Sequence, residues 1–402
     1  MDDLHQRIVV RSLGLAFVLG VVACEPTGSS PVPYTLDVPA HFPELVVPED
    51  NPLTQAGVEL GRYLFHDFRL SGNGERSCGI CHEPAKGFTD GFVRAVGATG
   101  ESHTLNTLSL VNVGYRGSLG WRSPEETRLE EQWHIPMFGD DPIEMGITED
   151  ELVHRLETIE RYPPMFEAAF PDSREGSPIS IQNVGRALAS FQRTIIGGNA
   201  DYDRFTQGDD TAMSESAVQG MIIFTGLGCD ECHGGTFFDE PTPDLEARYG
   251  DHGYANTGQY NLANGSGYPP EETGLSAGTN TPEDNGRFRI PTLRAVGQTG
   301  PWSHDGTTLF LADLIDDYAR GGRNVETGPY AGDGADNPNK NQRITGFDLS
   351  ETEQGQLLDF LGALTDHSLL ERPELQTPFC LIAADVILNE PCERVESVLT
   401  SD

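Results

Sequence analysis

Two five-residue stretches decide how this chain is built: Cys78-Gly79-Ile80-Cys81-His82 and Cys229-Asp230-Glu231-Cys232-His233. Both follow the pattern Cys-x-x-Cys-His, which is typical of c-type haem attachment. Each thiol can add to a haem vinyl group, and the histidine that follows can bind the iron. A zinc site would have to combine both copies, and a thioredoxin-like pair needs no trailing histidine. The two motifs therefore predict two covalently bound haem c groups.

Helical periodicity around the motifs predicts a mainly α-helical fold. Capping boxes at Thr148/Glu151 and Ser350/Glu353 open two of the helices. No strand pattern persists, and residues 234–286 are rich in Gly, Pro and Asn, which indicates long loops. The expected helices span 54–67, 148–159, 181–196, 214–227, 309–319 and 350–364.

The expected architecture is two cytochrome-c-like helical domains, each with one covalent haem and long loops. The first domain covers residues 46–198 and the second covers 199–370, with the boundary near 197–208. A tail, 371–402, follows. The two domains form a diverged duplication at most, because no strict repeat is visible.

The N-terminal residues predict an export signal. Arg7 and Arg11 precede an apolar run, 13–23, that is too short to span a bilayer. We expect residues 1–23 to be a lipoprotein signal peptide and Cys24 to carry the lipid, followed by a tether, 24–45. The alternatives are an ordinary signal peptide with an incidental cysteine, or a start site placed too early. The predicted location is the periplasm or the outer membrane, with membrane contact only through the lipid.

Composition restricts the partners. The 402 residues include 63 acidic and 26 basic side chains, giving a formal charge of −37. Such a chain has no basic surface for nucleic acid or for anionic membranes. With 37% hydrophobic residues, it can form genuine cores. A basic or neutral protein, or a small neutral substrate, is the easier partner.

Cys380 and Cys392 remain outside the motifs. In an oxidising compartment they could close a short C-terminal loop as a disulfide. Two free thiols on the tail are the alternative.

Further matching segments lie around both motifs, and through them residues 45–370 resemble the bacterial di-haem cytochrome c peroxidase and MauG family. Within that family, residues 109–113 and 135–139 look most like the MbnH-like branch, whose enzyme accompanies copper-binding proteins and oxidises a tryptophan on its partner. The matching segments are Leu60-Gly61-Arg62-Tyr63-Leu64-Phe65, Arg69-Leu70-Ser71-Gly72, 106–112, Trp121, Glu131-Gln132, Ile143-Glu144-Met145, 288–294 and His304-Asp305-Gly306.

The resemblance implies a peroxidatic first haem, held by His82, that reacts with hydrogen peroxide. In the family, a glutamate aided by a glutamine moves a proton between the peroxide oxygens; Glu144 and Gln132 match those positions. Burial in a haem pocket would raise the pKa of such a carboxyl group. Without the family segments around them, both residues would be taken for exposed polar side chains.

Three further residues take roles from the resemblance. Trp121 matches a tryptophan between the two haems that carries electrons or holes, although a core aromatic is the simpler interpretation of a lone Trp. Pro136 matches a proline of the distal pocket. Asn106 matches a residue near an inter-haem calcium ion, which Thr281 and a neighbouring carbonyl could complete.

The role of His103 stays open: it is an iron ligand, a pocket acid/base or a surface histidine. The second iron, held by His233, shows the largest departure from the family. Residues 298–304 contain neither the Met nor the Tyr that the family supplies there. The sixth ligand is therefore absent or comes from elsewhere; the candidates are Tyr254, Tyr260 and His304. A missing Met would lower the potential of this haem, which favours a site that stores oxidising equivalents.

Three functions follow from these features. The leading one is a peroxidase-type enzyme that uses hydrogen peroxide to oxidise a partner by long-range electron transfer, either a copper-binding protein or a small electron donor. The alternative is a cytochrome c peroxidase that removes peroxide with electrons from a small cytochrome. The third is a non-catalytic di-haem carrier, which would have no need of a proton relay at Glu144 and Gln132.

Overall fold

The computed structural model describes residues 31–173, 177–240, 253–262, 265, 267–383 and 386–391, without the side chains of 380–391. The expected signal peptide and the lipid site at Cys24 lie outside the described residues. So does the expected disulfide between Cys380 and Cys392. The described residues, from Pro31 onward, form one compact unit. The expected division into domains 46–198 and 199–370 stays a prediction.

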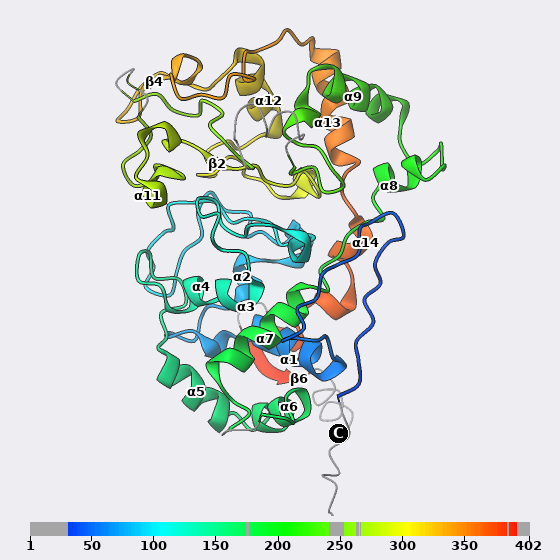
Figure 1. The fold of residues 1–402 in the computed structure, drawn as a ribbon, viewed down its shortest axis with the longest axis vertical. Coiled ribbons are helices and arrows are strands. Elements are labelled where there is room, and N and C mark those ends of the chain that lie inside the picture. The colour runs from blue at the N-terminus through cyan, green and yellow to red at the C-terminus, as the bar shows by residue number, and fades with distance from the viewer. Residues whose placement is uncertain are drawn as a thin grey trace, which may run out of the picture. The chain divides into compact units, whose positions relative to one another are not determined.

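The first helix pair consists of α1 (Gln55–His66) and α7 (Ile181–Gln192), which lie side by side (Figure 1). Thr54 caps α1, because its hydroxyl accepts a hydrogen bond from the Gly57 N–H at 3.0 Å. Gly61 permits the close approach: a Cβ there would lie 1.9 Å from the carbonyl oxygen of Ala187.

The expectation that the second helix of this pair reaches residue 196 is wrong. Helix α7 ends at Gln192. The chain then leaves the helical path and pairs with Asn112, whose backbone N–H donates to Ile195 and whose amide group exchanges two hydrogen bonds with Gly197. Tertiary partners thus replace the last helical turn.

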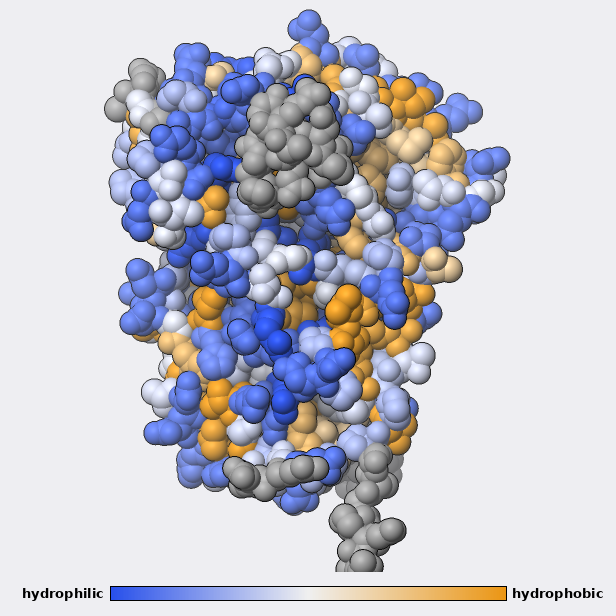
Figure 2. All heavy atoms as spheres, in the orientation of Figure 1, coloured by the Kyte–Doolittle hydropathy of each residue, from blue (hydrophilic) through white to orange (hydrophobic). Residues whose placement is uncertain are grey.

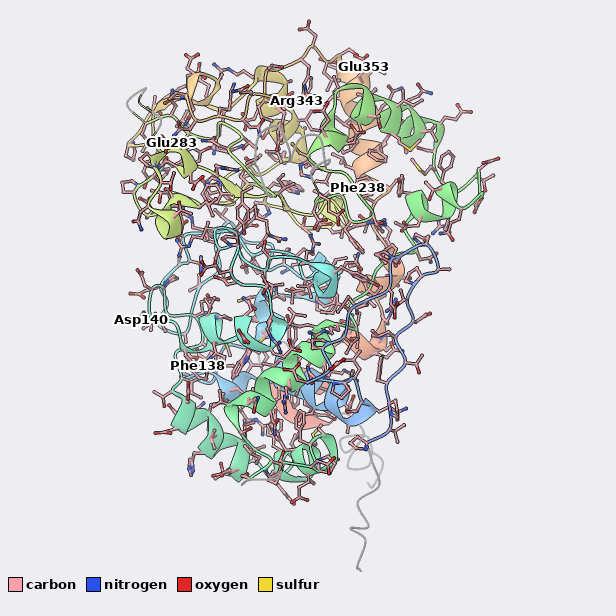
Figure 3. All side chains as sticks on the ribbon, in the orientation of Figure 1. Phe138, Asp140, Phe238, Glu283, Arg343 and Glu353 are labelled. Carbon is pink, nitrogen blue, oxygen red and sulfur yellow. The ribbon has the colours of Figure 1, made fainter. Side chains whose placement is uncertain are left out.

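A second pair, α9 (Glu215–Gly226) and α13 (Glu351–Gly362), repeats this arrangement. Here Gly220 permits contact: a Cβ there would lie 1.9 Å from the carbonyl oxygen of Gln356. The predicted capping box of α13 is confirmed. Ser350 accepts from the Glu353 N–H at 3.3 Å, and the Glu353 carboxylate accepts from the Ser350 N–H at 2.9 Å (Figure 3).

The other predicted helices are present with small differences. Helix α5 (Glu149–Thr158) is capped by Thr148, but the Glu151 carboxylate pairs with Arg155 instead of returning to the cap. Helix α12 (Leu311–Arg320) begins two residues later than expected. Short helices that the periodicity did not predict are α2 (Cys78–Cys81), α3 (Leu129–Gln132), α4 (His134–Phe138), α6 (Tyr162–Ala169), α8 (Asp201–Thr206), α11 (Ser276–Thr279) and α14 (His367–Leu370).

No strand pattern persists in the sequence, yet short strands are present. The described residues contain three two-stranded antiparallel ladders, and two of them are only two residues long per strand. Strands that short leave too few alternating positions for a period of two to appear in the sequence. The pairs are β1 (Tyr254–Ala255) with β2 (Phe288–Arg289), β3 (Asn324–Val325) with β4 (Gly332–Asp333), and β5 (Phe379–Ala383) with β6 (Val386–Pro391).

Two large hydrophobic clusters form the core. One gathers buried residues from 60–195 together with Ala295, Leu369 and Leu375, and the other gathers residues from 213–364. On the face shown in Figure 2, hydrophilic residues are interspersed with smaller hydrophobic patches. Among the described residues, no helix combines the length and the apolar character that crossing a membrane requires.

Candidate haem and peroxide site

The first motif forms the short helix α2 and ends at His82. The Nδ1 atom of His82 lies 3.0 Å from the carbonyl oxygen of Phe88, which the loop presents by placing Phe88 at φ 59°. Burial lowers the pKa of His82 and raises the pKa of the Cys78 and Cys81 thiols to about 12. The motif thus presents two neutral thiols and a neutral imidazole.

The second motif repeats this geometry. The Nδ1 atom of His233 lies 3.1 Å from the carbonyl oxygen of Phe238, which has φ 55° (Figure 3). Burial lowers the pKa of His233 and raises the pKa of Cys229 to about 11. None of the four motif cysteines forms a disulfide.

Both histidines are therefore oriented as metal ligands. A neutral imidazole that donates through Nδ1 to a backbone carbonyl keeps its proton there. Its Nε2 lone pair then remains available, and the carbonyl fixes the direction of the ring. With the same arrangement in both motifs, each histidine would hold one haem iron through Nε2.

A cavity of about 260 Å³ lies beside the first motif. It brings together all the residues that the sequence predicted for the peroxide site: Glu144, Gln132, Pro136 and Trp121. Asn106 lines it as well. Residues from four separate segments thus converge next to His82, as the catalytic hypothesis requires; their catalytic roles stay predictions.

His103 also lines the first cavity, where it contacts Glu144. Its Nε2 atom lies 3.5 Å from the Glu144 Oε1 atom, and its Nδ1 atom accepts a hydrogen bond from the Leu105 N–H at 2.9 Å. The two side chains are 21% and 29% exposed, so the pair lies between the cavity and solvent.

A second cavity of about 300 Å³ lies beside the second motif. No carboxylate is found among the described residues that line it, whereas Glu101, Glu126 and Glu144 line the first. The second cavity is lined instead by aromatic, aliphatic, hydroxyl and amide side chains, with Arg289 and Arg343 as its cations.

Of the three candidates for the sixth ligand, the structure brings only His304 to this cavity. The Tyr254 hydroxyl bonds to Ser118 and the Tyr260 hydroxyl bonds to Asp305, at 3.1 and 2.5 Å. His304 is buried, and its Nε2 atom has no hydrogen-bond partner in the described part of the chain. Burial lowers its pKa to about 4, which keeps the imidazole neutral. Tyr318, which the sequence reasoning missed, lines the same cavity.

A shared wall separates the two cavities. Trp121, Asn106 and Arg289 line both of them. The Trp121 indole N–H donates to the Asn106 carbonyl at 2.8 Å, and the Trp121 carbonyl accepts from the Arg289 N–H at 2.8 Å. The Asn106 N–H in turn donates to the His304 carbonyl at 2.7 Å. Trp121 therefore lies between the sites, held on both sides by backbone hydrogen bonds.

The calcium hypothesis gains no geometric support. Thr281 is exposed, lines neither cavity and donates its hydroxyl to the Thr279 carbonyl. The Asn106 amide nitrogen donates to the carbonyls of Phe92 and Val93. No cluster of three or more His, Cys, Asp or Glu side chains fit for a metal occurs in the described ranges. Calcium at Asn106 and Thr281 stays a prediction.

Orphaned polar atoms test whether the cavities fit haem. Buried nitrogens of Arg76 and Arg289, the Gln259 amide oxygen and the His304 Nε2 atom have no partners among the described residues, and all four residues line a cavity. Buried polar atoms normally find partners. Arginines can pair with the two propionates of a haem, and the thiols and imidazoles suit its vinyl groups and iron. The residues present fit one haem in each cavity.

A helical chain with two such cavities and a tryptophan between them defines the class of di-haem redox proteins. The model of the family described as "Di-haem cytochrome c peroxidase" matches residues 55–211. The methylamine utilization protein MauG of Methylorubrum extorquens (strain AM1) is 33% identical over 319 residues, which cover 79% of this chain and 80% of that protein. The chain belongs to this di-haem cytochrome c peroxidase and MauG family, and it is a peroxidase-type oxidoreductase.

Other relatives agree. Cytochrome-c peroxidase IdrP1 of Pseudomonas sp. (strain SCT) is 31% identical over 342 residues, covering 81% of this chain and 85% of that protein. The crystal structure of a MauG-like protein associated with microbial copper homeostasis superposes with a TM-score of 0.80 at 37% identity, covering 86% of this chain and 99% of that one. The predicted family is thus confirmed.

Sequence reasoning missed several cavity residues. Arg289 lies in a segment already matched to the family, so its residue type and position were the available signal. No signal in the sequence pointed to Arg116, Arg343 and Tyr318. Single residues on loops or helices without a motif cannot be assigned to a pocket before the chain is folded.

Proposed function

We propose that the chain is a di-haem c-type enzyme that uses hydrogen peroxide to oxidise a partner protein or a small electron donor by long-range electron transfer. The observation that carries this proposal is the inequality of the two cavities. Glu144, Gln132 and His103 line the first, whereas the described lining of the second contains no carboxylate. One site is equipped for proton transfer and the other for electron transfer.

Bound haem supplies electron transfer at both sites and a place for peroxide at the first. Reducing one hydrogen peroxide to two waters consumes two protons and two electrons. Glu144 is the residue we assign to proton transfer: it accepts a proton from one peroxide oxygen and returns it to the other. Gln132 orients the peroxide by hydrogen bonding, and Pro136 shapes the cavity wall.

Trp121 provides the route between the sites. Trp121 lines both cavities, its ring N–H donates to the Asn106 carbonyl, and its backbone carbonyl accepts from the Arg289 N–H. An indole between two redox centres shortens each transfer step. The two electrons can therefore come from a donor that never enters the first cavity.

The second site favours storage of oxidising equivalents over a high-potential entry port. In the segment where the family supplies Met or Tyr, the residue directly before His304 is Ser303. The Ser303 hydroxyl is hydrogen-bonded to the Thr308 hydroxyl at 2.7 Å. We assign His304 as the sixth ligand of this haem, because its neutral Nε2 is buried, unpartnered among the described residues and at the cavity. Two nitrogen ligands give a lower potential than His and Met.

We propose a copper-binding protein as the oxidised partner, because the MauG-like structural neighbour is associated with microbial copper homeostasis. A small cytochrome donor, as in a peroxide-removing cytochrome c peroxidase, is the second candidate, favoured by the relative named for that activity. The periplasm, reached through an export signal and a lipid at Cys24, suits either partner.

The test is a titration of the fully oxidised protein with hydrogen peroxide, followed by absorption and EPR spectroscopy. We expect a prompt reaction without prior reduction, with both ferric signals lost together. The Trp121→Phe variant keeps an aromatic ring but removes the indole and its N–H, and we expect the second ferric signal to be lost more slowly than the first.

Two outcomes would change the assignment. A reaction that begins only after one haem is reduced would indicate the peroxide-removing cytochrome c peroxidase. An inert protein with both irons six-coordinate would indicate a non-catalytic carrier.

A further inference from the structure

The loop that follows the first motif brings a histidine to the predicted proton-transfer residue. His103 Nε2 lies 3.5 Å from Glu144 Oε1, and both residues line the first cavity. Such contacts are often long in a protein without substrate and tighten when substrate binds. The pair is therefore within reach of a working hydrogen bond.

The hydrogen bonds of His103 determine its tautomer. Nδ1 accepts from the Leu105 N–H at 2.9 Å, so this atom carries no proton. The proton of the neutral ring must then lie on Nε2, the atom that faces Glu144. His103 is thus placed to donate from Nε2 to the Glu144 carboxylate, which faces it at 3.5 Å. The Leu105 N–H already occupies the other ring nitrogen, Nδ1.

The backbone holds the two residues together. The segment 95–103 folds back on itself through a bridge between Val96 and Ser102, and the His103 N–H donates to the Ala95 carbonyl at 2.8 Å. Its tip docks on the proton-transfer residue, because the Ala98 N–H donates to the Glu144 carbonyl at 2.7 Å.

Gly97 makes this docking possible. A Cβ at that position would lie 1.8 Å from the Ile143 carbonyl oxygen and 3.1 Å from the Glu144 Cα. The first distance is shorter than any real Cβ contact, and the second is tighter than most. The loop is therefore fitted to the backbone that carries Glu144.

We propose that His103 is a positioning residue that holds the Glu144 carboxylate in the first cavity through its Nε2–H, with the 95–103 loop as its support. This inference rests on the proposed peroxide chemistry. It gives the loop a function, where the sequence left His103 open between an iron ligand, a pocket acid/base and a surface histidine.

Two substitutions separate this role from a purely structural one. His103→Asn keeps a side-chain acceptor for the Leu105 N–H, in an Asx-turn, but cannot reach Glu144. His103→Gln loses that turn but places an amide N–H where Nε2 lies. Exposed His154 on α5 supplies the control, His154→Asn.

The experiment uses the purified di-haem protein and measures the rate at which hydrogen peroxide bleaches the ferric EPR signal of the first haem. We expect His103→Asn to slow this rate about 10- to 100-fold, His103→Gln to recover most of it, and His154→Asn to match the parent protein. The resting EPR spectrum of the first haem should be the same in all four proteins.

Other outcomes overturn the proposal. If His103→Asn reacts with peroxide at the parent rate while His103→Gln reacts slowly, His103 serves only to form the turn with Leu105. A changed resting spectrum in both variants would make it an iron ligand. If the parent protein fails to react with peroxide at all, the proposed function fails instead, and the variants need not be compared.

Discussion

The two motif-bearing halves share a scaffold and differ in their cavities. In each, a glycine lets one helix pack closely on a later one, Gly61 on α7 and Gly220 on α13. In each, the motif histidine bonds through Nδ1 to the carbonyl of a phenylalanine with positive φ. The scaffold therefore holds an imidazole in one orientation in both halves, whatever chemistry surrounds it.

The difference lies in the side chains that line each cavity. In the first half these include Glu144, Gln132 and His103; in the second they include Trp302, His304 and Tyr318. The motifs differ as well. Gly79 is pressed against His66, since a Cβ at Gly79 would lie only 2.3 Å from the His66 Nδ1 atom, whereas the second motif carries Asp230 at the same place. In the proposed function, this common support serves proton transfer in one half and electron storage in the other.

The largest effect is expected where the halves differ most. Glu144→Gln keeps the shape of the side chain but removes the base, so the reaction of the oxidised protein with peroxide should slow by about 100- to 10,000-fold, with both haems retained. Stopped-flow absorption measures the rate. Glu126→Gln is the matched control, since Glu126 lines the same cavity but bonds to Ser123. Equal rates for Glu144→Gln and the parent would remove Glu144 from the mechanism.

A change confined to the second cavity should be visible in only one haem. His304→Phe removes the Nε2 atom that has no partner among the described residues, and we expect the low-spin EPR signal of the second haem to be replaced by another while the resting signal of the first is kept. Tyr260→Phe is the control, because its hydroxyl bonds to Asp305 outside the cavity. A second-haem signal that survives His304→Phe would point to Tyr318 or to an open position.

Acid should lower the free energy of unfolding through the protonation of His66. This residue is buried, its Nε2 atom lies 3.2 Å from the Leu375 carbonyl, and burial lowers its pKa from 6.5 to about 4. In the unfolded chain His66 takes up a proton near pH 6.5, whereas in the folded chain it does so only near pH 4. The free energy of unfolding should therefore fall across this window, by about 3 kcal/mol from this group.

Urea unfolding at several pH values checks this slope. His66→Gln, which cannot be protonated, should lose that part of the pH dependence while the contributions of the other histidines remain. The same slope in both proteins would show that His66 titrates normally.

The smallest expected effect is the loss of stability when a helix cap is removed, compared at two helices. Ser350→Ala breaks a complete capping box and should cost about 1 kcal/mol, whereas Thr148→Ala breaks only half of one and should cost about 0.5 kcal/mol. Urea midpoints of the two variants against the parent measure both. Equal losses would mean that the Glu353 side of the box contributes nothing.

Much of the architecture was readable from local pattern. The two motifs with their histidines, the individual helices around them and the Ser350 cap depend on residues close together in the chain, whose geometry is set by helical periodicity and capping. The end of α7 could not be read from local pattern, because Asn112, far away in the chain, forms hydrogen bonds with Ile195 and Gly197. The two-residue strands were too short to leave a periodic signal.

The candidate site divides in the same way. Residue types and family segments named Glu144, Gln132, Pro136 and Trp121, but not their meeting in one cavity. Only the tertiary structure brought His304, rather than Tyr254 or Tyr260, to the second cavity and set His103 against Glu144. The physical reason is that covalent attachment and capping depend on neighbours in the chain, whereas a pocket is formed by loops whose separation in sequence carries no information about their distance in space.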